Sequence, residues 1–284
     1  MPALSEEQIE RFHEDGCLLV EDVLPAEDLT PLIREFEQVV DAAARRLHAE
    51  GALDKLFPEA PFERRLAQLY AAADAERRDE LWRAVQGKHH KTPGLFAVFT
   101  HPALLDIAEA LLGPEILAHP QFNSRAKLPH QQATVVPWHQ DLGYLDPEAT
   151  ETFMVNCWIP LVDATMEMGA MQVIPGSHRW GLLPHEQVDG YLGFREESLP
   201  PHESRDCPMR LGGVVLLQHQ VVHRSVPNTS PKVRWSLDLR YCRPDAPTGR
   251  AEVPGFLCRS RRHPERVAQS VEDWLRLMNG RPLE

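Results

Sequence analysis

The chain has 284 residues, of which 43% are hydrophobic and 25% are charged. This composition is typical of a globular protein, and the length suffices for one large domain or two small ones. The formal net charge is -12, and no basic stripe interrupts it. Such a charge balance disfavours nucleic acid and anionic membrane surfaces as partners.

The five cysteines are odd in number, and none forms a CxxC pair. This argues against a disulfide framework or a thiolate zinc site and favours a reducing compartment. The N-terminal segment lacks the basic and apolar regions of a secretory signal, and the apolar runs look too short to span a membrane. We therefore expect a cytoplasmic protein.

The first part of the chain, residues 1–114, is predicted to be mainly helical. Ser5 begins a capping-box pattern, and a longer helix is expected after Pro25, where apolar residues recur at helical spacing. Two further helices are expected over 61–86 and from Pro102 to Leu112, and a terminal helix over about 263–279.

From about residue 115 to 243, short β-prone runs alternate with Gly, Pro and Asn. The candidate strands are 115–119, 121–127, 135–141, 152–162, 171–174, 213–218 and 233–242. Regular short strands of this kind are typical of a sandwich or barrel. We expect one α+β domain over 1–284, with helices packed on one side of a β-core.

The segment Val135–Asp141 contains a candidate metal site, because His139 and Asp141 lie at the end of a strand-like run. Residues at i and i+2 share one face of a strand but diverge on a helix. An imidazole and a carboxylate on one face, with a second histidine, form the 2-His-1-carboxylate triad of iron(II) oxygenases. The alternative is a surface hydrogen-bonded pair. Similar patterns at His13, His48 and His263 lie in helical surroundings and are not expected to bind metal.

The second histidine should come from a distant strand. His223 fits, because it follows the apolar run 213–217 and precedes Ser225 and Arg234. His219 is a rival at the end of the same run, but it lacks the downstream serine and arginine at the same spacing.

Four segments, in order and spacing, resemble the phytanoyl-CoA dioxygenase family of Fe(II)/2-oxoglutarate-dependent oxygenases. They are WHQD at 138–141, NCWIPLVDAT at 156–165, MQVIPGSHRWG at 171–181, and H-x-S-x-x-N-x-S-x3-R from His223 to Arg234. The resemblance covers about 121–241, and the opening SEEQIERFHEDGCLLVEDVL is also similar. It implies a double-stranded β-helix (jelly roll, cupin-like) core with flanking helices. It further implies hydroxylation of a small-molecule substrate with O2, while 2-oxoglutarate becomes succinate and CO2.

The resemblance implies that His139, Asp141 and His223 bind iron(II). It assigns Arg234 to the 5-carboxylate of 2-oxoglutarate, which a guanidinium fork binds in bidentate fashion. Ser225 matches a hydroxyl that supports the same carboxylate.

Further positions are expected around the cosubstrate. By resemblance, Trp158 forms an aromatic wall, Gln140 lies beside the metal, and Lys127 reaches cosubstrate or substrate. Gln121 and Asn123 share the strand face of Lys127 and would line the same pocket. The plain alternatives are that Trp158 belongs to the core and that Lys127 is a solvated strand end.

Alternation along 233–242 places two kinds of side chain on opposite faces of a strand. Arg234, Ser236, Asp238 and Arg240 would line the barrel, while Val233, Trp235, Leu237, Leu239 and Tyr241 would pack under helices. Arg240 is predicted to form an ion pair, with Asp238 as its partner, or to support the site from behind.

Two sequence details qualify the resemblance. The family usually shows Glu-Asn-Gly where this chain has Glu167-Met168-Gly169, so a polar group is replaced by a thioether. Related halogenases have a small residue in place of the carboxylate ligand, and Asp141 therefore favours hydroxylation over chlorination.

The remaining histidines are given structural interpretations. His178 is expected to hydrogen-bond within a turn. His89, His90 and His185 are interpreted as solvated, because none has a carboxylate at strand spacing.

The substrate is not evident from the sequence. Residues 182–208 and the helical first third are expected to cover the pocket. A CoA thioester would need a basic phosphate-binding cluster, and none is convincing, so a small metabolite or natural-product intermediate is favoured. Two other functions stay open: a cupin-like metal enzyme that does not use 2-oxoglutarate, and a non-catalytic 2-oxoglutarate sensor.

Overall fold

A computed structural model describes residues 4–280 of the chain. The helices are α1 (Glu6–Asp15), α2 (Ala26–Ala49), α3 (Phe62–Ala72), α4 (Arg78–Arg83), α5 (Pro93–Phe99), α6 (Pro102–Leu112) and α7 (Val271–Met278). The strands are β1 (Cys17–Val20), β2 (Ile116–Ala118), β3 (Asn123–Lys127), β4 (Val136–His139), β5 (Met154–Pro160), β6 (Met171–Val173), β7 (Glu186–Val188), β8 (Tyr191–Gly193), β9 (Arg205–Cys207), β10 (Val214–Gln218), β11 (His223–Ser225), β12 (Arg234–Cys242) and β13 (Phe256–Arg259).

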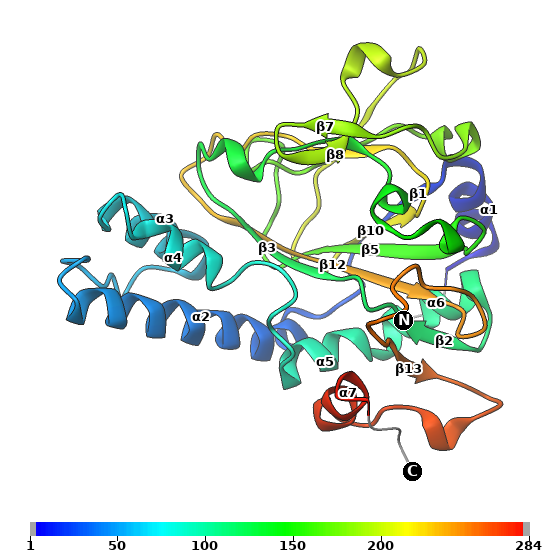
Figure 1. Cartoon of the computed structure of the whole chain (residues 1–284), viewed down its shortest axis with the longest axis horizontal. Helices are drawn as coiled ribbons and strands as arrows, with labels where there is room; N and C mark the ends of the chain where they lie inside the picture. Colours follow the sequence, from blue (N-terminus) through cyan, green and yellow to red (C-terminus); the bar gives the residue numbers. More distant parts are fainter. Residues whose placement is uncertain (1–3, 281–284) are drawn as a thin grey trace.

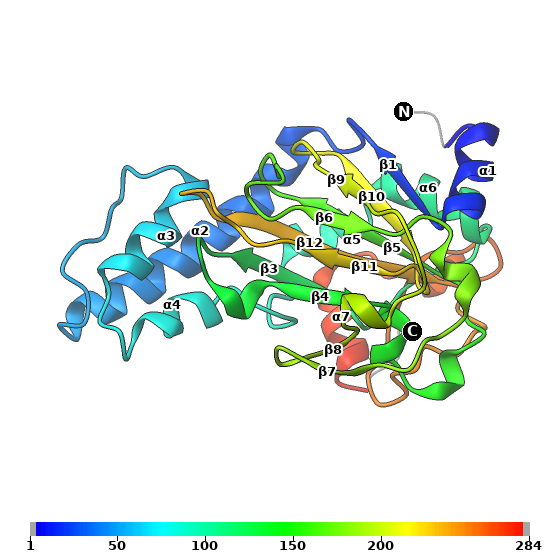
Figure 2. The ribbon, with the colours of Figure 1, turned by 90° about the horizontal axis from the view of Figure 1, so that it is seen from above.

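The strands form a jelly roll of two antiparallel sheets. The larger sheet has the order β1-β10-β5-β12-β2-β13, with β3 also paired to β12, and the smaller has the order β4-β11-β6-β9. Helices α2, α5 and α6 lie along one side of the larger sheet, and the β7–β8 hairpin lies on the opposite side of the molecule (Figure 1). Seen from above, the strands of the smaller sheet lie over those of the larger one (Figure 2). The α+β jelly roll expected from the sequence is therefore confirmed.

Strand β12 divides the interior into an apolar layer and a polar one. Its side chains Trp235, Leu237, Leu239 and Tyr241 belong to the large core between the sheet and the helices. Trp235 stacks on Phe62 of α3 with ring centroids 4.6 Å apart. Its alternate residues turn inward, because successive side chains of a strand point to opposite faces. The two predicted faces of this strand are thus both present.

Several predicted boundaries are wrong. The helix expected over 61–86 is two helices, because Ala73 is extended and forms a β-bridge with Leu53. Helix α5 was not predicted. The terminal helix begins only at Val271, where Ser270 caps it by accepting a bond from the Asp273 amide. Strands β1 and β13 extend the larger sheet beyond the expected β-core of 115–243.

The stretch Pro93–Leu112 also corrects the expectation that every apolar run is short. Its mean hydropathy of 1.6 and its length of 20 residues meet the criteria for a membrane span, although core helices meet them too. Here the stretch is two helices, α5 and α6, separated at Thr100 and His101. Residues such as Leu95, Phe99 and Leu104 are fully buried in the core, so we interpret the stretch as core helices.

Candidate metal centre

The three predicted metal ligands converge between the two sheets. His139 ends β4 and lies directly across from His223, which begins β11. Asp141 begins a short 3-10 turn, but the intervening Gln140 is extended (φ -112°, ψ 134°), so Asp141 keeps the alternation of a strand. The i, i+2 spacing therefore brings both side chains to the same point.

The ligand atoms face one another at metal-site distances. Nε2 of His139 and Nε2 of His223 each lie 3.8 Å from a carboxylate oxygen of Asp141, and one ligand atom from each residue lies within 4.8 Å of the others. Nδ1 of His139 contacts the Pro137 carbonyl at 2.9 Å, and Nδ1 of His223 contacts the Val221 carbonyl at 3.0 Å. Those contacts fix Nδ1 as the protonated nitrogen and leave both Nε2 atoms free to bind metal.

The electrostatics suit metal binding. Burial, with the neighbouring His223, lowers the pKa of His139 to about 3, so its imidazole is neutral. Burial opposes ionisation of Asp141, but the charges of Arg240 and the two histidines hold its pKa well below its usual range. Two neutral imidazoles and one carboxylate are the donor set of a 2-His-1-carboxylate iron(II) site, so these residues fit the metal.

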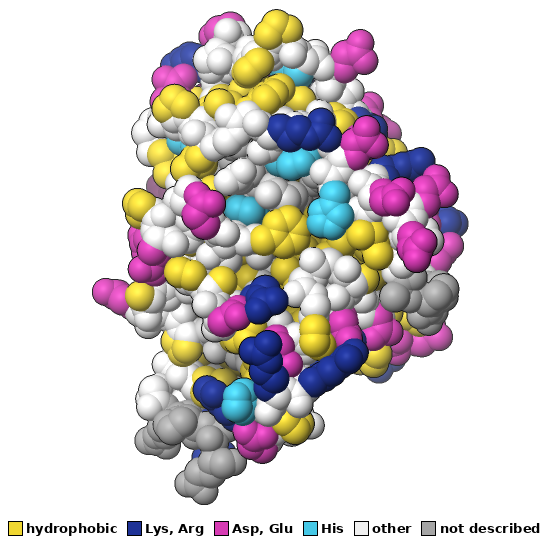
Figure 3. Space-filling model, turned by 90° about the vertical axis from the view of Figure 1, so that its right-hand side faces the viewer, with side chains coloured by type: hydrophobic (Ala, Val, Ile, Leu, Met, Phe, Trp, Pro, Cys, Tyr) yellow, Lys and Arg dark blue, Asp and Glu magenta, His cyan; other side chains and the backbone are white. Residues whose placement is uncertain are grey.

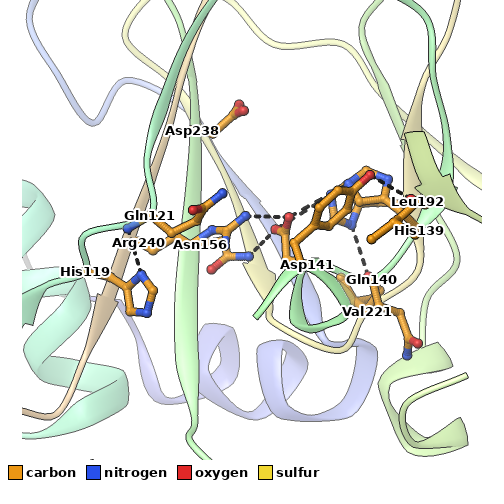
Figure 4. A network of polar contacts seen from close by, with 12 residues as sticks. His119, Gln121, His139, Gln140, Asp141, Asn156, Leu192, Val221, Asp238 and Arg240 are labelled. Atoms are coloured by element: carbon orange, nitrogen blue, oxygen red, sulfur yellow. Dashed lines mark hydrogen bonds and ion pairs between the residues drawn. The ribbon is translucent and has the colours of Figure 1, made fainter. Parts of the chain in front are cut away.

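Two further side chains hold the Asp141 carboxylate (Figure 4). Arg240 donates from Nη2 to one carboxylate oxygen at 2.6 Å, and Asn156 donates from its side-chain amide to the other. Arg240 thus supports the site from behind, which was one predicted alternative, whereas the other, a pairing with Asp238, is wrong. Arg240 lies across from Asn156 of β5 and reaches Asp141 with it, whereas Asp238 bonds Arg125 at 2.5 Å.

The triad opens into a cavity between the two sheets. Its walls combine triad residues, charged residues of β3 and β12, and apolar residues from both sheets. They are Arg125, Val136, His139, Asp141, Asn156, Cys157, Trp158, Met171, Leu217, His223, Arg224, Ser225, Arg234, Asp238 and Arg240. A concave site lined by converging polar groups together with apolar walls is typical of small-molecule binding.

Arg234 lies in this cavity as a buried cation. Its side chain is only 2% exposed, donates to Ser236 Oγ at 2.5 Å, and places its guanidinium 5.3 Å from the centre of the Trp158 ring. Among residues 4–280, Arg234 forms no ion pair, and its Nε has no hydrogen-bond partner. Burial lowers its pKa to about 10, so it stays charged at neutral pH. A buried, charged and unpaired guanidinium requires an anion.

Ser225 and Lys127 lie beside this arginine's strand. Ser225 Oγ accepts bonds from Lys127 Nζ at 2.9 Å and from the Val136 amide at 3.3 Å, so its own hydrogen is free to donate. Lys127 is 1% exposed, which excludes the solvated strand end. Burial, with Arg234 and Arg125 nearby, lowers its pKa to about 6. Gly169 packs against it, since a Cβ there would lie 2.6 Å from Lys127 Cδ.

Two predicted pocket residues lie elsewhere. The side chain of Gln140 points away from the triad, because it lies between two inward-facing residues. It donates to the carbonyls of Gly181 and Gln220 and accepts from the Leu183 amide, and thereby holds these loops together. Gln121 is buried but outside the cavity, where its Oε1 accepts bonds from Lys88 and Arg250.

Asn123 and Trp158 are closer to their expected places. Asn123 lines a second pocket beside the cavity, and Arg125 and Arg234 line both. Lys127, Trp82 and Gln86 also line this second pocket. Trp158 lines the main cavity. Arg125 and Asn156 were not predicted, although both share a strand face with a predicted residue, Lys127 and Trp158 respectively.

The other histidines lie outside the triad. His219 accepts a bond from the Met154 amide at 3.3 Å, and His178 bonds the His13 carbonyl at 3.2 Å, as a turn residue was expected to do. The interpretation of His90 and His185 as solvated is wrong. His90 bonds the Ala84 carbonyl and packs against Phe36, and His185 contacts the backbone of Gln140 and Leu183.

Residues 182–208 pack beside the segment 138–144, which contains the metal ligands His139 and Asp141. Tyr144, whose ring lies 5.8 Å from that of His139, donates to the Leu192 carbonyl at 2.6 Å, and the Phe194 amide donates to the Trp138 carbonyl at 2.7 Å. Tyr191 lines the second pocket. Residues 182–208 therefore contact β4, which ends at His139, and line the second pocket beside the cavity.

A jelly roll that encloses a buried His-Asp-His triad defines the class of non-haem metal-dependent oxygenases. The chain belongs to the phytanoyl-CoA dioxygenase family, whose model, described as "Phytanoyl-CoA dioxygenase (PhyH)", matches residues 12–236.

Two relatives and two solved structures illustrate the range of this similarity. Phytanoyl-CoA dioxygenase domain-containing protein 1 of Bos taurus is 27% identical over 82% of this chain and 88% of its own length. 1-Deoxypentalenic acid 11-beta-hydroxylase of Streptomyces arenae is 27% identical over 50% of this chain and 55% of its own. The non-heme monooxygenase ThoJ in its apo form superimposes with a TM-score of 0.65 at 23% identity, over 95% and 92% of the two chains. EvdO2 of Micromonospora carbonacea var. aurantiaca in complex with 2-oxoglutarate superimposes with a TM-score of 0.55 at 20% identity, over 87% of this chain and 96% of its own.

Proposed function

We propose that this protein hydroxylates a C–H bond of a small-molecule substrate, with conversion of 2-oxoglutarate and O2 to succinate and CO2. The observation that carries the proposal is one cavity that contains both an open His-Asp-His triad and the unpaired Arg234. The triad provides a metal site with free coordination positions, and the arginine provides an anchor for a dicarboxylate.

Each part of the cavity has a role in this proposal. When bound by His139, Asp141 and His223, iron(II) supplies the activation of dioxygen. Arg234 binds the distal carboxylate of 2-oxoglutarate through its guanidinium fork, and the free hydrogen of Ser225 supports the same carboxylate. Trp158 stacks beside that arginine, and Val136, Met171 and Leu217 exclude water.

Hydroxylation is proposed in preference to chlorination, because Asp141 occupies the position that a chloride would need. Two similarities support the proposal: a relative in Streptomyces is named as a hydroxylase, and a structural neighbour is described in complex with 2-oxoglutarate. The contacts of 182–208 with Trp138 and Tyr144 support a role for this segment as a cover over the substrate side of the cavity.

The test is a substrate screen with the iron(II)-loaded protein, 2-oxoglutarate and O2, in which products are identified by mass spectrometry. We expect a product heavier by one oxygen atom, formed in equal amount to succinate. Turnover of a substrate without 2-oxoglutarate would instead indicate a cupin-like enzyme. Binding of 2-oxoglutarate without succinate formation under any substrate would indicate a sensor.

A further inference from the structure

A group of cations lies beside the metal centre and has no part in the proposed chemistry. Lys88 Nζ and Arg250 Nε both donate to one atom, Oε1 of Gln121, the arginine at 3.3 Å. Lys91 Nζ donates to the Lys88 carbonyl at 3.0 Å, and Arg250 also donates to the carbonyl of Tyr144. Lys88, Lys91 and Arg250 are called the basic cluster below.

The basic cluster has no acidic partner among residues 4–280. Arginines on the surface are commonly paired, as Arg210 is with Glu21 at 3.0 Å, and charges of both signs interleave on the face in Figure 3. In contrast, burial lowers the pKa of Lys88, and the only charges that add to this effect are the cations Arg250, Arg240 and Lys91. Half-buried cations that share one amide oxygen are costly unless an anion joins them.

The basic cluster lies outside the cavity lining, near Arg240, which lines the cavity far along β12 from Arg234. The His119 amide donates to the Arg240 carbonyl at 2.9 Å, and the Gln121 amide donates to the His119 ring at 3.0 Å, so Gln121 lies close to Arg240. Figure 4 shows Gln121 next to Arg240, which in turn contacts Asp141. Arg234 lies six residues away along the same strand, roughly 20 Å at 3.3 Å per residue. An anion at the basic cluster would therefore not compete with 2-oxoglutarate at Arg234.

We propose that Lys88 and Arg250 bind an oxyanion of the substrate, a carboxylate or a phosphate, which replaces the Gln121 amide oxygen as their acceptor. This inference rests on the proposed function and narrows the substrate to an acidic small molecule. Such a substrate would be held by its anionic group at the basic cluster, with the rest of the molecule directed past Tyr144 and Arg240 toward the metal. The acidic chain would otherwise repel that substrate, so a local cationic site is required.

The test is calorimetric titration of acetate and of phosphate into the iron(II)- and 2-oxoglutarate-loaded protein under anaerobic conditions and low salt. Bound 2-oxoglutarate occupies Arg234, so the probes report on the remaining cations. We expect Lys88→Gln and Arg250→Gln each to weaken probe binding at least about tenfold, because each variant removes one of the two partly desolvated cations that would hold the probe. Lys88→Arg should restore it, and Arg210→Gln, on the surface, should leave it unchanged. The better-bound probe identifies a carboxylate or a phosphate substrate.

Equal probe affinity in the wild type, Lys88→Gln and Arg250→Gln would overturn the inference. The affinity for 2-oxoglutarate, titrated in the same preparations, separates this failure from that of the proposed function. If the wild type fails to bind 2-oxoglutarate, the proposed function fails, while the anion titration of the metal-loaded protein still tests the basic cluster.

Discussion

The two faces of β12 show how one strand divides stability from function. Toward the helices it presents Trp235 and Tyr241, which are packed in the apolar core. Toward the cavity it presents Arg234 and Arg240, two buried cations with incompletely satisfied donors. The apolar face lowers the free energy of the folded state by removing surface from water, whereas the charged face raises it until anions and metal arrive. Changes on the apolar face should therefore affect stability alone, whereas changes at the charged face should also affect the binding of metal or anion.

Asp141→Ala, which removes the partner of Arg240 on the charged face, should have the largest effect there. It removes a metal ligand and leaves Arg240 without its carboxylate, so we expect loss of metal binding and a loss of about 3–5 kcal/mol in unfolding free energy. Metal content after dialysis and urea denaturation of the metal-free protein measure the two effects. Wild-type metal content in the variant would contradict the assignment of the triad.

Trp235→Ala should have the largest effect on the apolar face. The side chain is 1% exposed and stacked on Phe62, and its removal should cost about 3–5 kcal/mol of unfolding free energy. The 2-oxoglutarate affinity of the folded fraction should stay near that of the wild type, because Trp235 does not face the cavity. Ser236→Ala, the next residue on the opposite face, is the control and should cost much less. Equal losses in the two variants would contradict the division of roles.

Arg240→Gln should weaken metal binding about 10–100-fold, the usual effect of removing a group that orients a metal ligand. The charge of Arg240 helps to hold the pKa of Asp141 down, so the loss should grow as the pH falls. Competition with a chelator measures the affinity. Arg125→Gln, which breaks a half-buried pair with Asp238 and no pair with Asp141, is the matched control. An equal loss in both variants would indicate a general electrostatic effect instead of positioning.

Lys127 should have a smaller effect, a pH-dependent uptake of protons when 2-oxoglutarate binds. Its pKa of about 6 lies below the ordinary value, so at pH 7–8 most of it is neutral in the free protein. A carboxylate bound at Arg234 raises that pKa, so binding of 2-oxoglutarate should take up a fraction of a proton above pH 6, and less below it. Calorimetry in two buffers of different ionisation enthalpy measures the uptake. Unchanged uptake in Lys127→Met would assign the proton to another group.

The sequence was sufficient to predict features that depend on local periodicity. The spacing of His139 and Asp141 and the alternation along β12 follow from strand geometry alone. The partners of Arg240 and Gln140 were not predictable, because they depend on neighbours 99 and 41 residues away or further. The basic cluster was missed for the same reason, since Lys88, Gln121 and Arg250 meet only through loops outside the family's motifs. Helix α5 was missed because its seven residues offer little periodicity.

The most direct test of the account is 2-oxoglutarate binding and succinate formation by the iron(II)-loaded wild type, Arg234→Gln and His139→Ala. Arg234→Gln removes the charge but keeps a polar side chain at that position. We predict slow succinate formation by the wild type without added substrate. We expect binding at least about 30-fold weaker in Arg234→Gln, since removal of one partner of a buried charged pair costs about 2–5 kcal/mol or more, and no succinate from His139→Ala. Wild-type affinity for 2-oxoglutarate in Arg234→Gln would contradict the central claim that this cavity holds the cosubstrate through Arg234.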